Sequence, residues 1–459
     1  MAEVAWRFVG AVLVVGLLCC GSAGGQRDGE TYRRLWSDSE VENRIARNIE
    51  QYRKSDVSIE LIDARGRALG EVDVAIEQVS HDFLFGCNLF VLGQLETAEA
   101  NAKYEAAFLR LFNSATIPFY WLGTEPTRGQ LRYEEGSAYL WRRPPADRLV
   151  AWCRQHDVVP KGHPLLWHAH NPEWLPTEAE VVKGLFVERF RQISDRYGDS
   201  ITLWDGVNEP VDCVRDFSLY SANRDYVAWA FREQRKVFPP QARLMINEMP
   251  HVCHEYNSQD PTQTRYYSHI RGLLGQGVRL DGIGFQFHIM SDRAIGEILA
   301  GQSYTPRRLL EVYELYDRFE MPMYVTEITI PTLADTETAA TFQDEMVRNC
   351  YRLWFSVPRM KGITWWNLGD GTAIANENRF QGGLLDENLE AKPSYRALDH
   401  LINREWKTNV SCKTTAEGRV AFRGFHGRYR VTVKTPGITR RREIHVQDDT
   451  PNRFKLAIW

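Results

Sequence analysis

The sequence has 459 residues, which is enough for a large hydrophobic core and for more than one domain. Hydrophobic residues make up 43% and charged residues 25% of the chain, as in ordinary globular proteins. The formal net charge of −4 provides no basic surface for nucleic acid and no polybasic segment for anionic lipid, so we expect neither partner.

The first 25 residues, MAEVAWRFVGAVLVVGLLCCGSAGG, have the order of a secretory signal peptide. Arg7 precedes an apolar run from Val9 to Leu18, and small residues follow that run. The run is too short to serve as a permanent bilayer anchor. We therefore expect residues 1–25 to be removed, no membrane span in the mature chain, and a secreted, periplasmic or cell-surface location.

Six cysteines follow this segment, namely Cys87, Cys153, Cys213, Cys253, Cys350 and Cys412. An oxidising compartment permits disulfides, and Cys213 with Cys253 is one plausible pair, although the sequence alone does not fix the pairing. The cysteine spacings do not resemble those of a zinc site. We expect neither a metal nor a cofactor.

The two flanks of the chain carry strand patterns. Residues 26–80 form an N-terminal extension in which SIELIDARGRALGEVDVAIEQ, from Ser58 to Gln78, predicts a β-hairpin around a glycine-containing turn. Residues 404–459 alternate like strands between glycine-rich turns and predict a small β module. We expect the module to pack with the hairpin into a β-sandwich; carbohydrate binding by the module is the alternative.

Residues 81–403 contain eight short apolar runs at regular spacing. The runs are Phe83–Gly86, Ala115–Trp121, Val158–Trp167, Ile201–Glu209, Arg243–Glu248, Gly282–His288, Met323–Ile328 and Gly362–Asn367. Amphipathic patterns such as EVVKGLFVERFRQISDRYG lie between them. Apolar strands alternating with helices predict an α/β fold with a parallel sheet covered by helices, and eight such units match a (β/α)8 TIM barrel.

Polar and aromatic residues gather where these runs end. In barrels of this kind the chemistry lies at the C-terminal ends of the strands. The residues at the ends of the third to eighth runs are His163, Trp167, His168, Asn208, Glu209, Asn247, Glu248, Gln286, His288, Glu327, Trp365, Trp366 and Asn367. One such residue could be a satisfied core group, but this many at one end of one sheet predict an active site.

Glu209 and Glu327 end the fourth and seventh runs, which lie across the predicted barrel from each other. Cleavage of a glycosidic bond needs a proton on the leaving oxygen and stabilisation of an oxocarbenium-like centre, and two carboxyl groups can provide both. One glutamate must then stay protonated near neutral pH while the other stays ionised. The pair therefore predicts a glycosidase.

Five segments together resemble one family. WDGVNEP with Glu209 and YVTEITIP with Glu327 resemble the acid/base and nucleophile motifs of glycoside hydrolase family 10, the xylanase family. GHPLLWHAHNPEWL, DGIGFQFHI and GGLLDENLEAKPSYRAL resemble its third-strand, sixth-strand and closing segments. The order is right and the resemblance covers roughly 83–403. It implies a secreted enzyme that cleaves internal β-1,4-xylosidic bonds of xylan or xylo-oligosaccharides.

The resemblance also assigns roles to single residues. Glu209 would be the general acid and base, and Glu327 the nucleophile, of a retaining double displacement. Asn208 would donate to the sugar 2-hydroxyl, and His288 would hold Glu327 in one rotamer. The other expected substrate-binding residues are His163, Trp167, Gln286 and Trp365.

The second run departs from the family. The family usually carries an asparagine and a lysine ahead of a tryptophan there, and these residues grip sugars on the non-reducing side. This chain has SATIPFYWLGTEPTRGQ, with Tyr120 and Trp121 in that region and no lysine. A second tryptophan, frequent after the family's eighth strand, is not obvious in GTAIANENRFQGG. The substrate could therefore be a decorated xylan or a short oligosaccharide.

Three alternatives stay open at this point. Another retaining barrel glycosidase, a mannanase or a glucanase, would share the arrangement of the two glutamates. A metal-dependent barrel hydrolase would use His168 and His170, whose spacing is that of a two-histidine ligand pair on a strand. A non-catalytic sugar-binding protein would not need two opposed carboxylates. The sequence does not indicate an oligomeric state.

Overall fold

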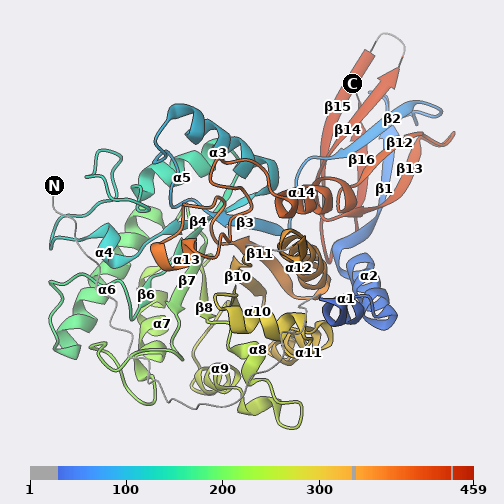
Figure 1. The fold of residues 1–459 in the computed structure, drawn as a ribbon. Helices are drawn as coiled ribbons and strands as arrows, with labels where there is room; N and C mark the ends of the chain where they lie inside the picture. Colours follow the sequence, from blue (N-terminus) through green and yellow to red (C-terminus); the bar gives the residue numbers. More distant parts are fainter. Residues whose placement is uncertain (1–28, 333–336, 436–437, 459) are drawn as a thin grey trace.

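The computed structural model describes residues 29–332, 337–435 and 438–458, and its centre is a closed parallel barrel (Figure 1). The barrel strands, in the order in which they pair, are β3 (Leu84–Asn88), β4 (Ser114–Pro118), β5 (Val159–His163), β7 (Leu203–Asn208), β8 (Arg243–Glu248), β9 (Gly282–His288), β10 (Met323–Thr329) and β11 (Met360–Trp365). Pairing of β11 with β3 closes the ring, and the short β6 (Leu166–Trp167) adds to β7. The (β/α)8 prediction is confirmed. The predicted signal peptide lies outside the described residues.

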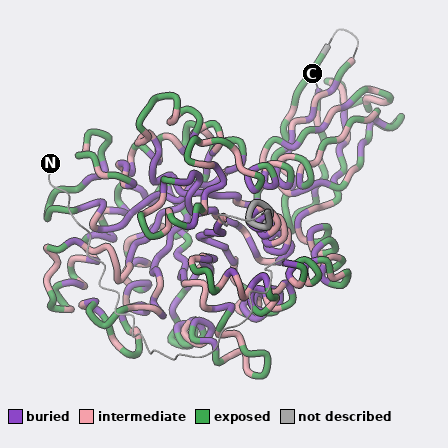
Figure 2. The backbone as a smooth tube through the Cα atoms, in the orientation of Figure 1, coloured by how far each residue is buried: buried purple, intermediate pink, exposed green. Residues whose placement is uncertain are grey.

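Helices cover the outside of this barrel (Figure 1). Those within residues 81–403 are α3 (Ala98–Leu111), α4 (Trp121–Thr124), α5 (Ala146–Gln155), α6 (Ala179–Tyr197), α7 (Asp225–Val237), α8 (Val252–Glu255), α9 (Arg265–Gly275), α10 (Asp292–Leu299), α11 (Pro306–Asp317), α12 (Glu337–Ser356), α13 (Ala375–Asn378) and α14 (Pro393–His400), with the short η1 (Pro261–Gln263) and η2 (Leu401–Glu405). Every residue of β4, β7 and β10 is buried, which explains the continuous apolar runs of the sequence (Figure 2).

Two helices precede the barrel and pack against it. Strand patterns alone do not predict α1 (Glu30–Trp36) and α2 (Ser39–Arg53), which lie beside α10 and α12. Asp38 caps α2 by accepting hydrogen bonds from the amides of Glu40 and Val41. The apolar faces of the two helices join the barrel core through Tyr32, Trp36, Val41, Ile45 and Ile49.

The flanks of the chain meet in a β-sandwich that protrudes from the barrel (Figure 1). One sheet has the order β13-β1-β16 and the other the order β12-β2-β14-β15. Their bounds are β1 (Lys54–Ile62), β2 (Asp73–Gln78), β12 (Asn409–Lys413), β13 (Arg419–Phe425), β14 (Gly427–Thr435), β15 (Ile438–Val446) and β16 (Arg453–Ala457). Between the sheets lies a separate core that includes Ile59, Ile76, Tyr429 and Val431.

The predicted hairpin between β1 and β2 is wrong. The two strands lie in different sheets, and the isolated bridge between Ile62 and Ala68 joins β1 to the connecting segment and not to β2. The chain between them is long enough to cross the sandwich, so each strand takes C-terminal strands on both sides as partners. A central place in each sheet satisfies both edges of each strand, which a two-stranded hairpin cannot do.

The sandwich is attached at the end of the barrel that lies opposite the C-terminal strand ends. Trp406, which follows η2, is buried and stacks on Phe355 at a ring-centroid distance of 4.2 Å and on Phe85 at 5.8 Å. Arg53 donates to the carbonyls of Phe355 and Val357. A cavity of about 470 Å³ between the two parts is lined by residues at the starts of barrel strands and by residues of the sandwich. The mouth formed by the C-terminal strand ends is therefore free of the sandwich.

The six cysteines after the predicted signal peptide are all free thiols in the structure, including Cys213 and Cys253. The disulfide suggested for these two is therefore not formed. Among the described residues, no helix is both long and apolar enough to cross a membrane.

Candidate active site

Glu209 lies directly after β7, in a left-handed backbone conformation with φ of 51°. Such a conformation costs a residue other than glycine roughly 1–3 kcal/mol, so the surrounding contacts must hold it. Trp167 Nε1 donates to Glu209 Oε2 at 2.8 Å, and Gln286 Nε2 donates to Oε1 at 2.8 Å. Three strand ends therefore fix one carboxyl group in place.

Glu327 is a buried residue of β10, with two polar neighbours on its carboxylate. Asn247 Nδ2 donates to Oε1 at 2.9 Å, and His288 Nε2 lies 3.3 Å from Oε2. His288 Nδ1 lies 2.9 Å from the hydroxyl of Thr329. Burial lowers the pKa of His288, so its ring is neutral near pH 7 and orients Glu327 without adding a full positive charge.

Asn247 connects the two glutamates. Its amide nitrogen, which donates to Glu327, also donates to Asn208 Oδ1 at 2.7 Å, and Asn208 Nδ2 donates to Glu209 Oε1 at 3.1 Å. Thr326 fixes the orientation of Asn247 by donating to its Oδ1 at 2.6 Å. We expected Asn247 at this strand end but gave it no role, whereas the structure makes it the bridge between β7, β8 and β10.

A buried charge cluster lies below Glu327. Asp205 is fully buried in β7, and its Oδ2 lies 2.6 Å from Lys161 Nζ and 2.7 Å from His163 Nδ1. His163 Nδ1 is also 3.9 Å from Glu327 Oε1. Although burial raises the pKa of Asp205, Lys161 and His163 outweigh it and hold that pKa below its usual value. Lys161 and Asp205 were missed by the sequence analysis, and the signal was a charge inside an otherwise apolar strand.

An aromatic cluster lines the same mouth. Phe90, Tyr120 and Trp366 form a small buried cluster separate from the main core, and Trp167 packs against it. The ring of Tyr120 lies 5.3 Å from that of His163 and 5.6 Å from that of Trp167. Tyr120 thus packs against Trp167, the residue whose indole N–H donates to Glu209.

Trp365, which we expected to contact sugar, is not part of this cluster. It is completely buried in the main core, and its indole N–H donates to the carbonyls of Asn367 and Gly382. The adjacent Trp366 faces the mouth instead, with its ring 5.4 Å from that of His163. Neighbouring residues of an extended segment point to opposite sides, so only one of the two tryptophans can reach the substrate.

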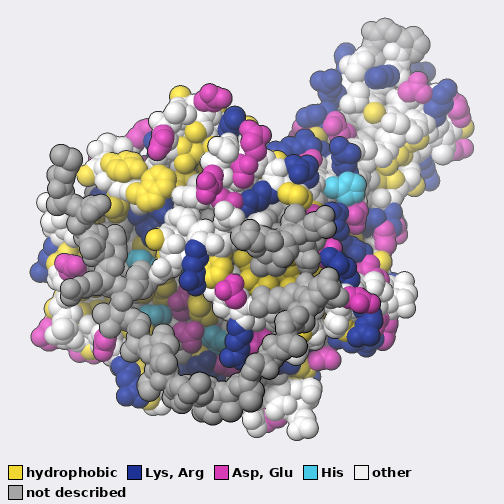
Figure 3. Space-filling model, in the orientation of Figure 1, with side chains coloured by type: hydrophobic (Ala, Val, Ile, Leu, Met, Phe, Trp, Pro, Cys, Tyr) yellow, Lys and Arg dark blue, Asp and Glu magenta, His cyan; other side chains and the backbone are white. Residues whose placement is uncertain are grey.

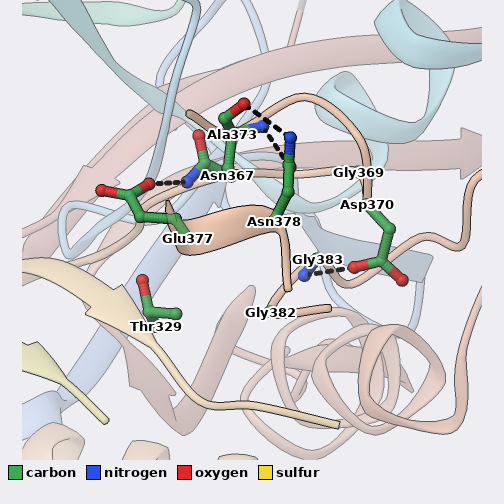
Figure 4. Close-up of a pocket in the computed structure, with 9 residues that line it drawn as sticks. All are labelled: Thr329, Asn367, Gly369, Asp370, Ala373, Glu377, Asn378, Gly382 and Gly383. Carbon is green, nitrogen blue, oxygen red and sulfur yellow. Dashed lines mark hydrogen bonds between the residues drawn. The ribbon is translucent and has the colours of Figure 1, made fainter. Parts of the chain in front are cut away.

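The loop after β11 forms one wall of a small pocket beside Thr329 (Figure 4). Glu377 of α13 accepts from Asn367 Nδ2 at 3.0 Å, as the figure shows. Asp370 accepts from the Gly383 amide at 2.8 Å. These contacts place a third carboxylate, that of Glu377, near the mouth.

The electrostatic surroundings of Glu209 and Glu327 differ. Burial, with the negative charge of Glu327 as the second cause, raises the pKa of Glu209 to about 7. Burial also raises the pKa of Glu327, likewise to about 7, against the opposing influence of His163 and Lys161 and the hydrogen bond from the Asn247 amide. Since both pKa values are raised to about 7, the two groups titrate as a coupled pair, in which Lys161 and His163 favour the negative charge on Glu327.

This assignment predicts how activity depends on pH. Since Glu209 must be protonated to act as an acid, kcat/KM should fall as the pH rises through about 7. A pH profile on a neutral oligosaccharide measures this limb. The variant Glu135→Gln, at an exposed surface site, should keep the same profile. A kcat/KM that still rises far above that pH would contradict the assignment.

Among the described residues, one group lies close enough together to share a metal ion, namely Asp212, Glu248 and His251. Glu248, however, already accepts from the amides of Val211 at 2.7 Å and Met249 at 2.9 Å. His168 and His170, the pair considered for a metal-dependent hydrolase, do not belong to this group. The ring of His170 packs instead against Trp167 at 5.1 Å.

Several curated proteins are similar to this chain. Anti-sigma-I factor RsgI6 of Acetivibrio thermocellus is 23% identical over 395 residues, which cover 85% of this chain and 46% of that protein. Endo-1,4-beta-xylanase A of Halalkalibacterium halodurans is 33% identical over 172 residues, covering 32% and 42%. Endo-1,4-beta-xylanase 3 of Hypocrea jecorina is 27% identical over 285 residues, covering 61% and 71%. The chain spans less than half the length of the first two relatives.

Solved structures share the barrel. Xylanase 10B from Thermotoga petrophila RKU-1, determined in complex with xylobiose, superimposes with a TM-score of 0.56 at 22% identity, over 71% of this chain and 95% of that one. At this identity the likeness shows the fold. The model of the family described as Glycosyl hydrolase family 10 matches residues 81–400, well over half of the sequence, and the chain therefore belongs to that family.

Proposed function

We propose that this protein hydrolyses internal β-1,4-xylosidic bonds of xylan or xylo-oligosaccharides with retention of configuration. The observation that carries the proposal is the unequal setting of the half-buried Glu209 at the end of β7 and the buried Glu327 of β10. Burial raises the pKa of both groups to about 7, but Lys161 and His163 favour the ionised form of Glu327. An acid and a nucleophile on one mouth are what a retaining glycosidase requires.

The reaction follows from these positions. Glu209 gives its proton to the glycosidic oxygen while Glu327 attacks the anomeric carbon, and the sugar becomes bound to Glu327. Glu209, now ionised, takes a proton from water, and the resulting attack on the anomeric carbon releases Glu327. Two inversions at one carbon retain its configuration. The family assignment and the xylanases among the relatives support xylan as the substrate.

The remaining site residues take supporting roles in this proposal. Gln286 and Trp167 hold the Glu209 carboxyl group, and His288 holds that of Glu327. Asn208 lies between the two carboxyl groups, where its amide can pass from Glu209 to a sugar 2-hydroxyl. His163 lies beside Glu327. Trp366 takes the sugar-contacting role that we expected of Trp365.

The release of reducing sugar from glucuronoxylan, arabinoxylan, mannan and mixed-linkage glucan tests the substrate. We expect release from the xylans, and no release by a Glu327→Gln control. Release from mannan or glucan alone would keep the two-glutamate mechanism and overturn xylan as the substrate. A failure on every polymer and on xylo-oligosaccharides would overturn the proposal as a whole.

We further propose that the sandwich supports the barrel and does not bind carbohydrate. Sugar-binding surfaces usually present aromatic faces, whereas Phe422 and Phe454 of the sandwich pack against its own core. Lys and Arg side chains are spread over the protruding part in Figure 3. Secretion of the enzyme is also a proposal, and it rests on the sequence of residues 1–25.

A further inference from the structure

Arg143 places a positive charge at the aromatic cluster of the mouth. Its guanidinium carbon lies 4.0 Å from the ring centroid of Tyr120 and 5.4 Å from that of Phe90. Its stem passes over Gly123 of α4, where a Cβ atom would come within 2.8 Å of Arg143 Cδ. Aromatic rings and a glycine thus form a fitted cradle for this side chain.

The cradle lies next to the reacting groups. Tyr120 contacts both His163 and Trp167, and the charge of Glu327 acts on the Tyr120 hydroxyl. That hydroxyl makes no hydrogen bond to a described residue, and it is not fully enclosed, so solvent can reach it. Tyr120 and Arg143 therefore present polar atoms to whatever enters the mouth beside Glu327.

The neighbouring Arg142 is buried and has protein acceptors on Nη1, although its Nε has no partner among the described residues. Its Nη1 donates to Asn367 Oδ1 at 2.9 Å and to the carbonyl of Thr372. Glu377 is the carboxylate that acts on both arginines, and it accepts from the amide nitrogen of Asn367. One carboxylate thus stands against two guanidinium groups.

Glu377 acts on Arg143 only from a distance, and no carboxylate of the described residues forms an ion pair with it. One bond, from Nη1 to the carbonyl of Arg142 at 2.8 Å, accounts for its contacts with protein acceptors. The Arg143 side chain is half-buried, and none of its nitrogens is both enclosed and without a partner. The N–H groups that make no bond to protein can therefore be reached from solvent. Burial, aided by Arg143, lowers the pKa of His170 to about 4, so His170 adds no charge at pH 7.

We propose that Arg143 binds a carboxylate carried by the sugar chain, so that the enzyme recognises a uronic acid substituent on the Tyr120 side of the mouth. This inference rests on the proposed glycosidase function and names a feature of its substrate. A guanidinium group matches a planar carboxylate with two parallel N–H donors, and partial removal from water strengthens that pairing. A neutral sugar would leave the guanidinium group of Arg143 without an ion-pair partner.

Two matched substrates test the proposal. One is a xylo-oligosaccharide with a single uronic acid branch, and the other is the same molecule after reduction of its carboxyl group to a primary alcohol. We expect the wild-type enzyme to have a kcat/KM about tenfold higher or more for the acid. Arg143→Gln should abolish this ratio, and Arg143→Lys should keep part of it, because an ammonium group cannot form the bidentate pair. The branch should remain on the product with the new reducing end.

Arg154→Gln, an exposed arginine on α5, serves as the control and should leave the ratio unchanged. A wild-type ratio near one, or a ratio that survives Arg143→Gln, would overturn the inference while leaving the proposed function intact. If no oligosaccharide is cleaved, the proposed function fails, and calorimetric binding of the two molecules to the Glu327→Gln protein still decides on Arg143. If the Glu327→Gln protein binds the acid more tightly than the alcohol, and adding Arg143→Gln removes this preference, the inference is supported. Equal binding of the two molecules refutes it.

Discussion

Glu327→Gln is expected to lower kcat on xylo-oligosaccharides by on the order of 10⁴-fold or more, as removal of other enzymatic nucleophiles does. Glutamine has the same shape and can still accept from Asn247 through its carbonyl oxygen, but it cannot attack the anomeric carbon. Initial rates, read together with the unfolding temperature, separate lost chemistry from lost folding. The unfolding temperature should stay close to that of the wild type.

The same variant has a second effect that a damaged site would not show. Removing the negative charge of Glu327 removes the second cause of the raised pKa of Glu209, so that pKa should fall. Titration of Glu209 by NMR measures the shift directly. A near-normal rate, or an unchanged titration of Glu209, would refute the assignment of Glu327.

Trp406→Ala is expected to destabilise the protein by about 3–5 kcal/mol, the usual range for removing a buried tryptophan. The ring fills the junction between barrel and sandwich, where it stacks on Phe355 and Phe85. Its loss leaves a cavity near the junction, where Phe425 of β13 also packs against Phe355. The midpoint of urea unfolding and the hydrogen exchange of β1 and β2 measure the effect.

Two matched variants accompany this measurement. The Trp406 indole N–H has no partner in the structure, so Trp406→Phe keeps the stacking, removes an unsatisfied donor and should cost much less than alanine. Trp141→Ala removes a tryptophan that is 41% exposed, and it should change stability by under about 1 kcal/mol. Equal losses in all three variants would refute the role of Trp406 at the junction.

The sequence predicted the barrel because burial on both faces makes its strands conspicuous. The runs Arg243–Glu248 and Gly282–His288 coincide with β8 and β9, and the two glutamates stand at the expected strand ends. A closed parallel barrel brings all these ends to one mouth, so that their grouping follows from topology. The positions of Glu209, Gln286 and His288 could therefore be predicted without knowledge of any side-chain rotamer.

Other features depend on information that a local pattern does not hold. Trp365 and Trp366 are adjacent and alike, and only the register of β11 decides which of them faces the mouth. The strands β1 and β2 look like a hairpin because their actual partners lie at the other end of the sequence. Arg143 lies in a loop without periodicity, and only the fold brings it over the ring of Tyr120.

The sandwich imposes an order on the synthesis of this chain. Ser55 on β1 and His426, its hydrogen-bonding partner beside β14, are 371 residues apart, so the central strands of both sheets leave the ribosome long before the strands that flank them. At roughly 5–20 residues per second, β1 waits about 20–70 s for its partners. During that interval two hydrophobic strands have unpaired edges, which makes the nascent chain a substrate for chaperones until β12 to β16 complete the sandwich.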